Sequence, residues 1–232
     1  MKKAFLLLSL AAGTYAASAH SPQQHEDFKF FKPKKGDVTA EAGLVGGILN
    51  SDFALNNNAG MLRGRYFLKN NFAFRLGLNL SVENTKDNVY GPGNASGYTS
   101  TTNTGFLINL GVEKHFKGTA RLSPYVGGDL LLGIANARSK SDADNGGVYQ
   151  ANFAALSKQS DFSLGLRGVI GADYYIAPRV YLGGELGLGV LKTWAGETYT
   201  EVNGTVTTAP SAGSELNFGP SVVTGVRIGF VF

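Results

Sequence analysis

The chain lacks cysteine, has only three histidines, and contains no long apolar run of the kind that crosses a membrane as a helix. Without cysteine, a disulfide framework and a thiolate metal site are both excluded. The mean hydropathy of −0.04 is that of an ordinary soluble protein. However, a strand whose residues alternate between apolar and polar has the same average, so this value does not decide the fold class.

The charge balance gives no support for nucleic-acid binding. The formal net charge is +4, and two of the 21 basic residues, Lys2 and Lys3, lie at the N-terminus, so 19 basic residues stand against 17 acidic ones in the remainder. Glycine is abundant, with 32 residues, and favours turns and strands over helices. A length of 232 residues fits a single all-β domain.

The first 19 residues have the layout of a secretory signal peptide. Lys2 and Lys3 precede an apolar run over 4–12, and Ala17-Ser18-Ala19 offers a small-residue cleavage site. We expect export through the Sec route and cleavage after Ala19. Residues 20–36 are polar and aperiodic, and we expect a periplasmic leader. Its Phe28, Phe30 and Phe31 could touch an anionic lipid surface, or the segment could be a solvated tether.

The clearest structural pattern lies in residues 72–83, F-A-F-R-L-G-L-N-L-S-V-E. Even-numbered positions are apolar and odd-numbered positions are polar or small, which only the two-residue period of a strand separates. About ten such residues at ~3.3 Å each, tilted by ~45°, rise roughly 23 Å, close to the apolar thickness of an outer membrane. This segment is therefore long enough to cross a bilayer.

Eight alternating runs follow one another after residue 36. They cover residues 37–49, 59–68, 72–85, 101–116, 122–138, 160–176, 180–194 and 214–232. The second and third, fourth and fifth, and sixth and seventh runs are joined by short turns, whereas the other connections, near 50–58, 86–100, 139–159 and 195–213, are long. Short turns at one rim and long loops at the other are typical of membrane barrels. The prediction is an all-β fold, an eight-stranded antiparallel up-and-down transmembrane β-barrel over residues 37–232.

The odd-numbered face carries the charges of this predicted barrel. Five are basic and seven are acidic: Glu41, Arg63, Arg65, Arg75, Glu83, Glu113, Asp129, Arg167, Asp173, Glu185, Glu215 and Arg227. We expect the even-numbered face to meet lipid and the charged groups to pair inside a narrow lumen, because an unpaired buried charge is costly. Glycines on the same odd face leave an alternative open, a narrow wet passage: Gly127, Gly133, Gly183, Gly187 and Gly189.

Aromatic residues near the ends of the runs suggest two interfacial girdles. They are Tyr66, Phe72, Phe116, Tyr174 and Phe232 at the short-turn end and Trp194 at the far end.

The last residues, V-R-I-G-F-V-F over 226–232, resemble the closing strand of outer-membrane barrels. With the signal peptide and the eight runs, the chain resembles the small barrels of the OmpA/OmpX/OmpW-like group. The resemblance implies the outer membrane of a Gram-negative bacterium, contact with outer-membrane lipids and lipopolysaccharide, and recognition of the terminal Phe232 strand by the barrel-assembly machinery.

Sequence chemistry does not favour an enzyme. His20 and His25 lie in the leader, and His115 lies at the short-turn rim, where we expect an interfacial role rather than that of a catalytic base. Asp142, Asp144 and Asn145 resemble part of a calcium loop, but Phe153 stands where the closing glutamate belongs. We therefore predict no cofactor, no metal and no nucleic-acid partner.

The sequence predicts a structural or surface-interaction role, with the long loops as the place for an extracellular ligand. The alternatives are a narrow porin or transporter for small or apolar solutes, and a soluble lipocalin-like barrel.

Overall fold

The computed structural model describes residues 31–43, 60–90, 96–144, 153–221 and 227–232. The secondary-structure elements of the described residues are all strands: β1 (Val38–Gly43), β2 (Gly60–Lys69), β3 (Phe72–Tyr90), β4 (Ser96–His115), β5 (Leu122–Asp144), β6 (Phe153–Ala177), β7 (Val180–Trp194), β8 (Thr198–Val202), β9 (Thr205–Ala209), β10 (Ser214–Ser221) and β11 (Arg227–Val231). Within these ranges, no helix is long and apolar enough to span a membrane.

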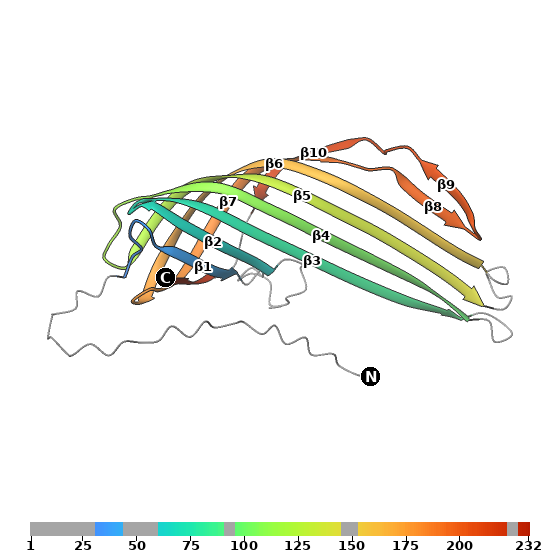
Figure 1. Ribbon diagram of the computed structural model, residues 1–232, viewed down its shortest axis with the longest axis horizontal. Helices are drawn as coiled ribbons and strands as arrows, with labels where there is room; N and C mark the ends of the chain where they lie inside the picture. Colours follow the sequence, from blue (N-terminus) through green and yellow to red (C-terminus); the bar gives the residue numbers. More distant parts are fainter. Residues whose placement is uncertain (1–30, 44–59, 91–95, 145–152, 222–226) are drawn as a thin grey trace.

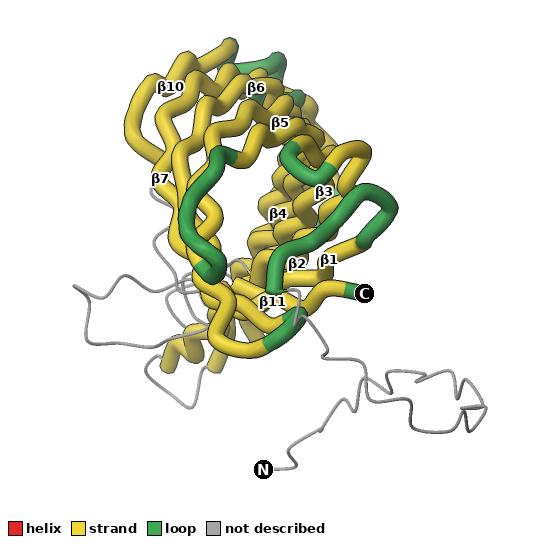
Figure 2. The backbone as a smooth tube through the Cα atoms, turned by 90° about the vertical axis from the view of Figure 1, so that its left-hand side faces the viewer, coloured by secondary structure: helices red, strands yellow, loops and turns green. Residues whose placement is uncertain are grey.

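The strands close into a ring of antiparallel neighbours, seen end-on in Figure 2. The order around the ring is β1-β2-β3-β4-β5-β6-β7-β11, and β11 pairs back with β1 through contacts such as Glu41 with Gly229. Both β10 and β11 pair with β7, at its two ends, so they are two parts of the predicted eighth run. The predicted eight-stranded antiparallel barrel is thus confirmed.

The start of β1 and the end of β11 lie together at the rim that carries the short turns (Figure 1). The amide of Phe232 donates to the carbonyl of Val38 at 2.8 Å, and the amide of Val38 donates to the carbonyl of Phe232 at 3.3 Å. Two residues separate β2 from β3, and two separate β6 from β7. Because outer-membrane barrels have short periplasmic turns, we expect this rim to face the periplasm and call it the periplasmic rim.

The alternation predicted from the sequence separates the two faces of the wall. Even-numbered apolar residues are exposed on the outside, among them Leu76, Leu110, Leu130 and Leu166, which lie in adjacent positions on neighbouring strands. Odd-numbered residues of the same strands are largely buried in the interior. The outer surface is therefore an apolar band of the kind that lipid hydrocarbon covers.

The long outer loops expected at 86–100, 139–159 and 195–213 form strand over most of their described residues, which corrects the prediction. The strands β3 to β6 continue well beyond the apolar band and are the longest in Figure 1. Alternating threonine, serine and asparagine side chains bond across the extended strands, as Asn84 does to Thr102 at 2.6 Å and Thr99 to Ser141 at 3.1 Å. These polar, strand-forming residues continue the backbone ladder into water.

The third of these segments folds into a hairpin, β8–β9, which extends the sheet beyond β6. Asn203 and Gly204 form its two-residue turn with φ values of 48° and 81°. Positive φ at both central residues is the requirement of a type I′ turn, which Asn-Gly meets at little cost.

A charge introduced on the outer face tests this assignment of the membrane. Leu110→Arg lies within the apolar band, so we expect it to destabilise the folded barrel by about 2–4 kcal/mol in lipid vesicles. Thr104→Arg, on the same face of β4 but nearer the outer end, should cost about 0–1 kcal/mol. Denaturant titration of both variants measures the difference, and equal costs would contradict the assignment.

Candidate functional site: a charge network across the lumen

Ten charged side chains with at most 7% exposure lie inside the ring. Five are arginines and five are carboxylates: Glu41, Arg63, Arg65, Arg75, Glu113, Asp129, Arg167, Asp173, Glu185 and Arg227. Each of the eight ring strands contributes at least one of them, because the odd-numbered residues of every strand point inward. The formal charges balance, which a low-dielectric interior requires of buried ions.

Glu185 on β7 receives the largest number of partners. Arg63 of β2 donates to its two oxygens at 2.9 and 3.1 Å, and Arg75 of β3 donates to both at 2.9 Å. Arg227 of β11 and the hydroxyl of Tyr125 also donate to it, at 3.0 and 2.7 Å. Since β2 and β3 are separated from β7 by other strands around the ring, these contacts cross the lumen.

A second group lies around Asp173 on β6. Its carboxylate accepts from Arg65 at 2.5 Å and from Arg227 at 3.2 Å. Glu41 on β1 lies 2.5 Å from the Nε of Arg65 and 3.3 Å from the Nε of Arg227. Planar guanidinium groups that share two or three carboxylates give a network with fixed geometry rather than isolated pairs.

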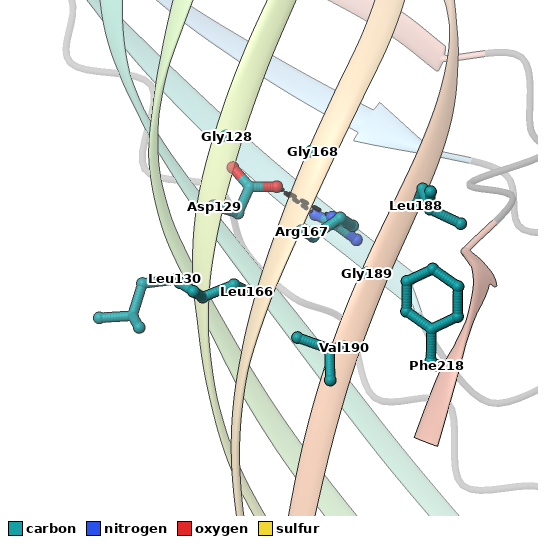
Figure 3. Close-up of a pocket in the computed structure, with 10 residues that line it drawn as sticks. All are labelled: Gly128, Asp129, Leu130, Leu166, Arg167, Gly168, Leu188, Gly189, Val190 and Phe218. Carbon is teal, nitrogen blue, oxygen red and sulfur yellow. Dashed lines mark hydrogen bonds and ion pairs between the residues drawn. The ribbon is translucent and has the colours of Figure 1, made fainter. Parts of the chain in front are cut away.

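The third group joins Asp129 on β5 to arginines on both sides. Arg75 donates to it at 2.8 Å, and Arg167 donates through Nε and Nη2 at 3.0 and 2.6 Å. Figure 3 shows the Asp129–Arg167 pair at a pocket in the wall of β5, β6 and β7. Other lining residues, such as Leu130, Leu166 and Phe218, belong to the exposed apolar surface. The pocket is therefore lined by residues of both the inner and the outer face of the wall.

Two acidic residues expected on the inner face do not reach the network. Glu83 on β3 and Glu215 on β10 are exposed. Glu83 lies eight residues beyond Arg75, about 27 Å along the strand at ~3.4 Å per residue, which is too far for a side-chain contact. The other ten predicted lumen charges are the ones that the structure brings together.

At several glycines of the inner face, a neighbouring side chain lies where a Cβ would stand. A Cβ at Gly183 would lie 2.6 Å from atoms of Arg227 and Asp173, and one at Gly127 would lie 3.1 Å from Val169. At Gly171 and Gly229 a Cβ would collide with the rings of Tyr125 and Tyr181, their cross-strand neighbours. Gly171, Gly183 and Gly229 therefore make room for long arginine and tyrosine side chains inside the ring.

The expectation for His115 was wrong. Instead of meeting the interface, its ring is buried, with Nε2 2.9 Å from Glu113 and Nδ1 2.9 Å from the hydroxyl of Ser123. Tyr125, which bonds Glu185 and Arg227, was not predicted at all. Both residues have odd numbers, and odd-numbered residues of these strands face the lumen, so the alternation could have predicted their position.

The end of the leader is attached to the periplasmic rim. Phe31 packs against Tyr175, Tyr181 and Val231, and the guanidinium of Arg121 lies 4.6 Å from the centre of the Phe31 ring. The amide of Gly36 donates to the carbonyl of Phe67 at 2.8 Å. Phe31 thus packs against barrel residues; Phe28 and Phe30, together with the expected signal peptide, lie outside the described residues.

The six predicted interfacial aromatics all lie on the outer face. Tyr66, Phe116, Tyr174, Trp194 and Phe232 are exposed, and Phe72 is half-buried against Phe74. At the outer end, Trp194 stacks on Phe162 with ring centres 5.8 Å apart. An interfacial role for them stays a prediction.

Three solved structures are similar to the chain. The N-terminal β-barrel domain of Pseudomonas aeruginosa OprF is 14% identical, with a TM-score of 0.36 over 86% of this chain and 100% of that one. A major outer membrane protein from Thermus thermophilus is 13% identical, with a TM-score of 0.34 over 84% and 99%. The outer membrane protein AlkL, solved in DMPC bilayers, is 15% identical, with a TM-score of 0.32 over 95% and 96%.

Among curated proteins, none matches the chain. A sequence model described as the putative OmpA-OmpF-like porin family matches residues 48–189, from just before β2 into β7. Because this match covers more than half of the chain, and the structure closes into a barrel with an apolar outer surface, the chain is an outer-membrane β-barrel that belongs to the OmpA-OmpF-like porin family.

Proposed function

We propose that this barrel is a non-conducting protein of the outer membrane, with a structural or surface-interaction role, whose lumen is closed by the charge network. The observation that carries the proposal is the set of ion pairs on Glu185, which connects β7 to β2, β3 and β11 through contacts of 3.1 Å or less. Side chains that meet in the middle of an eight-stranded ring leave little free cross-section.

The energetics support a permanent barrier. Each of the five arginines inside the ring contacts at least one carboxylate, and separating a buried ion from its partner costs about 3–5 kcal/mol. A path through the lumen would need several such separations at once. Phe31, packed on Tyr175 and Tyr181 at the periplasmic rim, adds a second obstruction below the network.

The second candidate is a narrow pathway for small solutes, in keeping with the name of the family. One feature favours it: Asn109 is buried on the inner face, and neither its amide nitrogen nor its carbonyl oxygen has a hydrogen-bond partner among the residues that the structure describes. Polar atoms of this kind are ordinarily bonded, and water in the lumen would satisfy them.

Conductance separates the two functions. We expect the purified protein to give no steady current in planar bilayers. The double variant Arg75→Ala/Glu185→Ala removes two central side chains while keeping the charges of the network balanced, and it should produce a measurable conductance. The control Glu83→Ala/Arg138→Ala makes the same chemical change at exposed positions and should stay silent. A stable, sizeable current through the unmodified protein would contradict the closed lumen. If Arg75→Ala/Glu185→Ala folds but gives no current, the charge network is not what closes the lumen.

The contribution of the network to stability is measured with a matched pair of isosteric variants. Glu185→Gln removes the charge that Arg63, Arg75 and Arg227 share and should lower the free energy of unfolding by about 3–5 kcal/mol. Glu83→Gln makes the same change on an exposed side chain and should alter it by less than about 0.5 kcal/mol. Trp194, the single tryptophan, reports unfolding by fluorescence in a urea titration. Equal effects of the two variants would contradict the proposed role of Glu185.

A further inference from the structure

The outer face of the barrel changes from apolar to basic beyond the membrane band. The last apolar row crosses three strands through Phe106, Ile134 and Phe162, which lie in adjacent register. Past this row the same face carries four cations, which we call the basic patch: Lys86 on β3, Arg138 and Lys140 on β5, and Lys158 on β6. All four are exposed.

The inner row of the basic patch, Arg138 and Lys158, stands at the outer edge of the polar layer of the outer leaflet. Arg138 lies four residues and Lys140 six residues beyond Ile134 on β5. At ~3.4 Å per residue and a tilt of ~45°, they stand about 10 and 14 Å above the last apolar row. The polar layer of a leaflet is about 5–8 Å thick, so Arg138 and Lys158, which faces it on β6, stand at the outer edge of this layer, within reach of the headgroups through their long side chains. The ammonium groups of Lys86 and Lys140 lie further out, at Tyr98.

Arg138 and Lys158 form an unfavourable pair. They are directly opposite each other in the register of β5 and β6, and like charges at such positions destabilise a sheet. Within the described parts of the chain, neither forms an ion pair with a carboxylate; Lys158 only lies 5.6 Å from the ring centre of Tyr199. A bound anion would offset the repulsion between them.

Lys86 and Lys140 converge on one aromatic ring one row further out. The ammonium of Lys86 lies 4.4 Å from the ring centre of Tyr98, and Lys140 donates to the Tyr98 hydroxyl at 3.0 Å. Lys140 also lies 3.4 Å from Asp142.

The basic patch retains a positive charge after its acidic neighbours are counted. Asp142 lies beside Lys140, and Glu201, opposite Leu156 on β6, accepts a hydrogen bond from Tyr199 at 3.1 Å. Asp144 occupies the next position of the same face of β5. Among the described residues, four cations therefore stand against three carboxylates. The arginine supplies a planar fork for phosphate, and the lysines supply compact charges that adapt to it.

We propose that the basic patch binds a phosphate group of lipopolysaccharide, the phosphorylated glycolipid of the outer leaflet, with Arg138 and Lys158 as the main ligands and Lys86 and Lys140 beside them. Its acyl chains would lie on the apolar row below the patch. This inference depends on the outer-membrane location and not on whether the lumen is closed.

The test uses the full-length protein in a neutral detergent, titrated with purified lipid A and with enzymatically dephosphorylated lipid A. The unmodified protein should bind the phosphorylated form at least about tenfold more tightly. Arg138→Gln/Lys158→Gln should lose this preference. The control Lys114→Gln/Lys117→Gln removes two exposed cations at the periplasmic rim and should keep it. Heat-modifiable gel mobility verifies the fold of each variant.

Three outcomes would overturn the proposal: equal binding of the two lipids by the unmodified protein, unchanged preference in Arg138→Gln/Lys158→Gln, or an equal loss in the control. If Arg138→Gln/Lys158→Gln does not fold, Lys86→Gln/Lys140→Gln serves in its place, with the same expected direction. A second readout is the sign of the stability change. Without lipid A, Arg138→Gln/Lys158→Gln should melt at a higher temperature than the unmodified protein, because the repulsion is gone. With saturating lipid A, the order should reverse.

Discussion

The structure depends on the mutual neutralisation of charges that are shielded from bulk water. Five arginines and five carboxylates are buried inside the ring, and the interior of an eight-stranded barrel is only wide enough for side chains. Buried charges are tolerated only when each has a partner with good geometry. Glu185, Asp173 and Asp129 meet this condition by pairing with arginines from several strands. The glycines beside them are a consequence, since a Cβ at Gly183 would displace the Arg227–Asp173 pair.

Residues of one strand alternate between two faces and meet three environments, which are lipid, the lumen and the water beyond the membrane. On β5, the outer residues are apolar from Val126 to Ile134, because lipid covers them, and then become polar at Asn136 and basic at Arg138. On the inner face, Tyr125 and Asp129 give way to small residues such as Gly133 and Ala137. The strand therefore changes its chemistry with depth while the backbone ladder continues unbroken. This continuity explains why segments that read as loops are strand: polar side chains that alternate satisfy the sheet as well in water as apolar ones do in lipid.

Sequence reasoning worked best where one rule acts alone. The parity of Arg75 among its apolar neighbours was enough to place it inside, and the same rule found all ten charges of the network. It failed for Glu83 because parity gives the face of a strand but not the height at which the other strands supply partners. His115 was placed wrongly because its position beside a turn was given more weight than its odd number, which indicates the inner face. The β8–β9 hairpin was missed although Asn203-Gly204 is typical of a tight turn.

The sequence by itself determined the class of the fold, the apolar outer side of each strand and the rim that carries the short turns, since all three follow from local periodicity and from turn lengths. Only the tertiary structure decided which charges meet. The partners of Glu185 lie on β2, β3 and β11, up to 122 residues away in the chain. Their pairing is set by how far each strand is shifted along its neighbours as the ring closes, and no local pattern in the sequence encodes that shift.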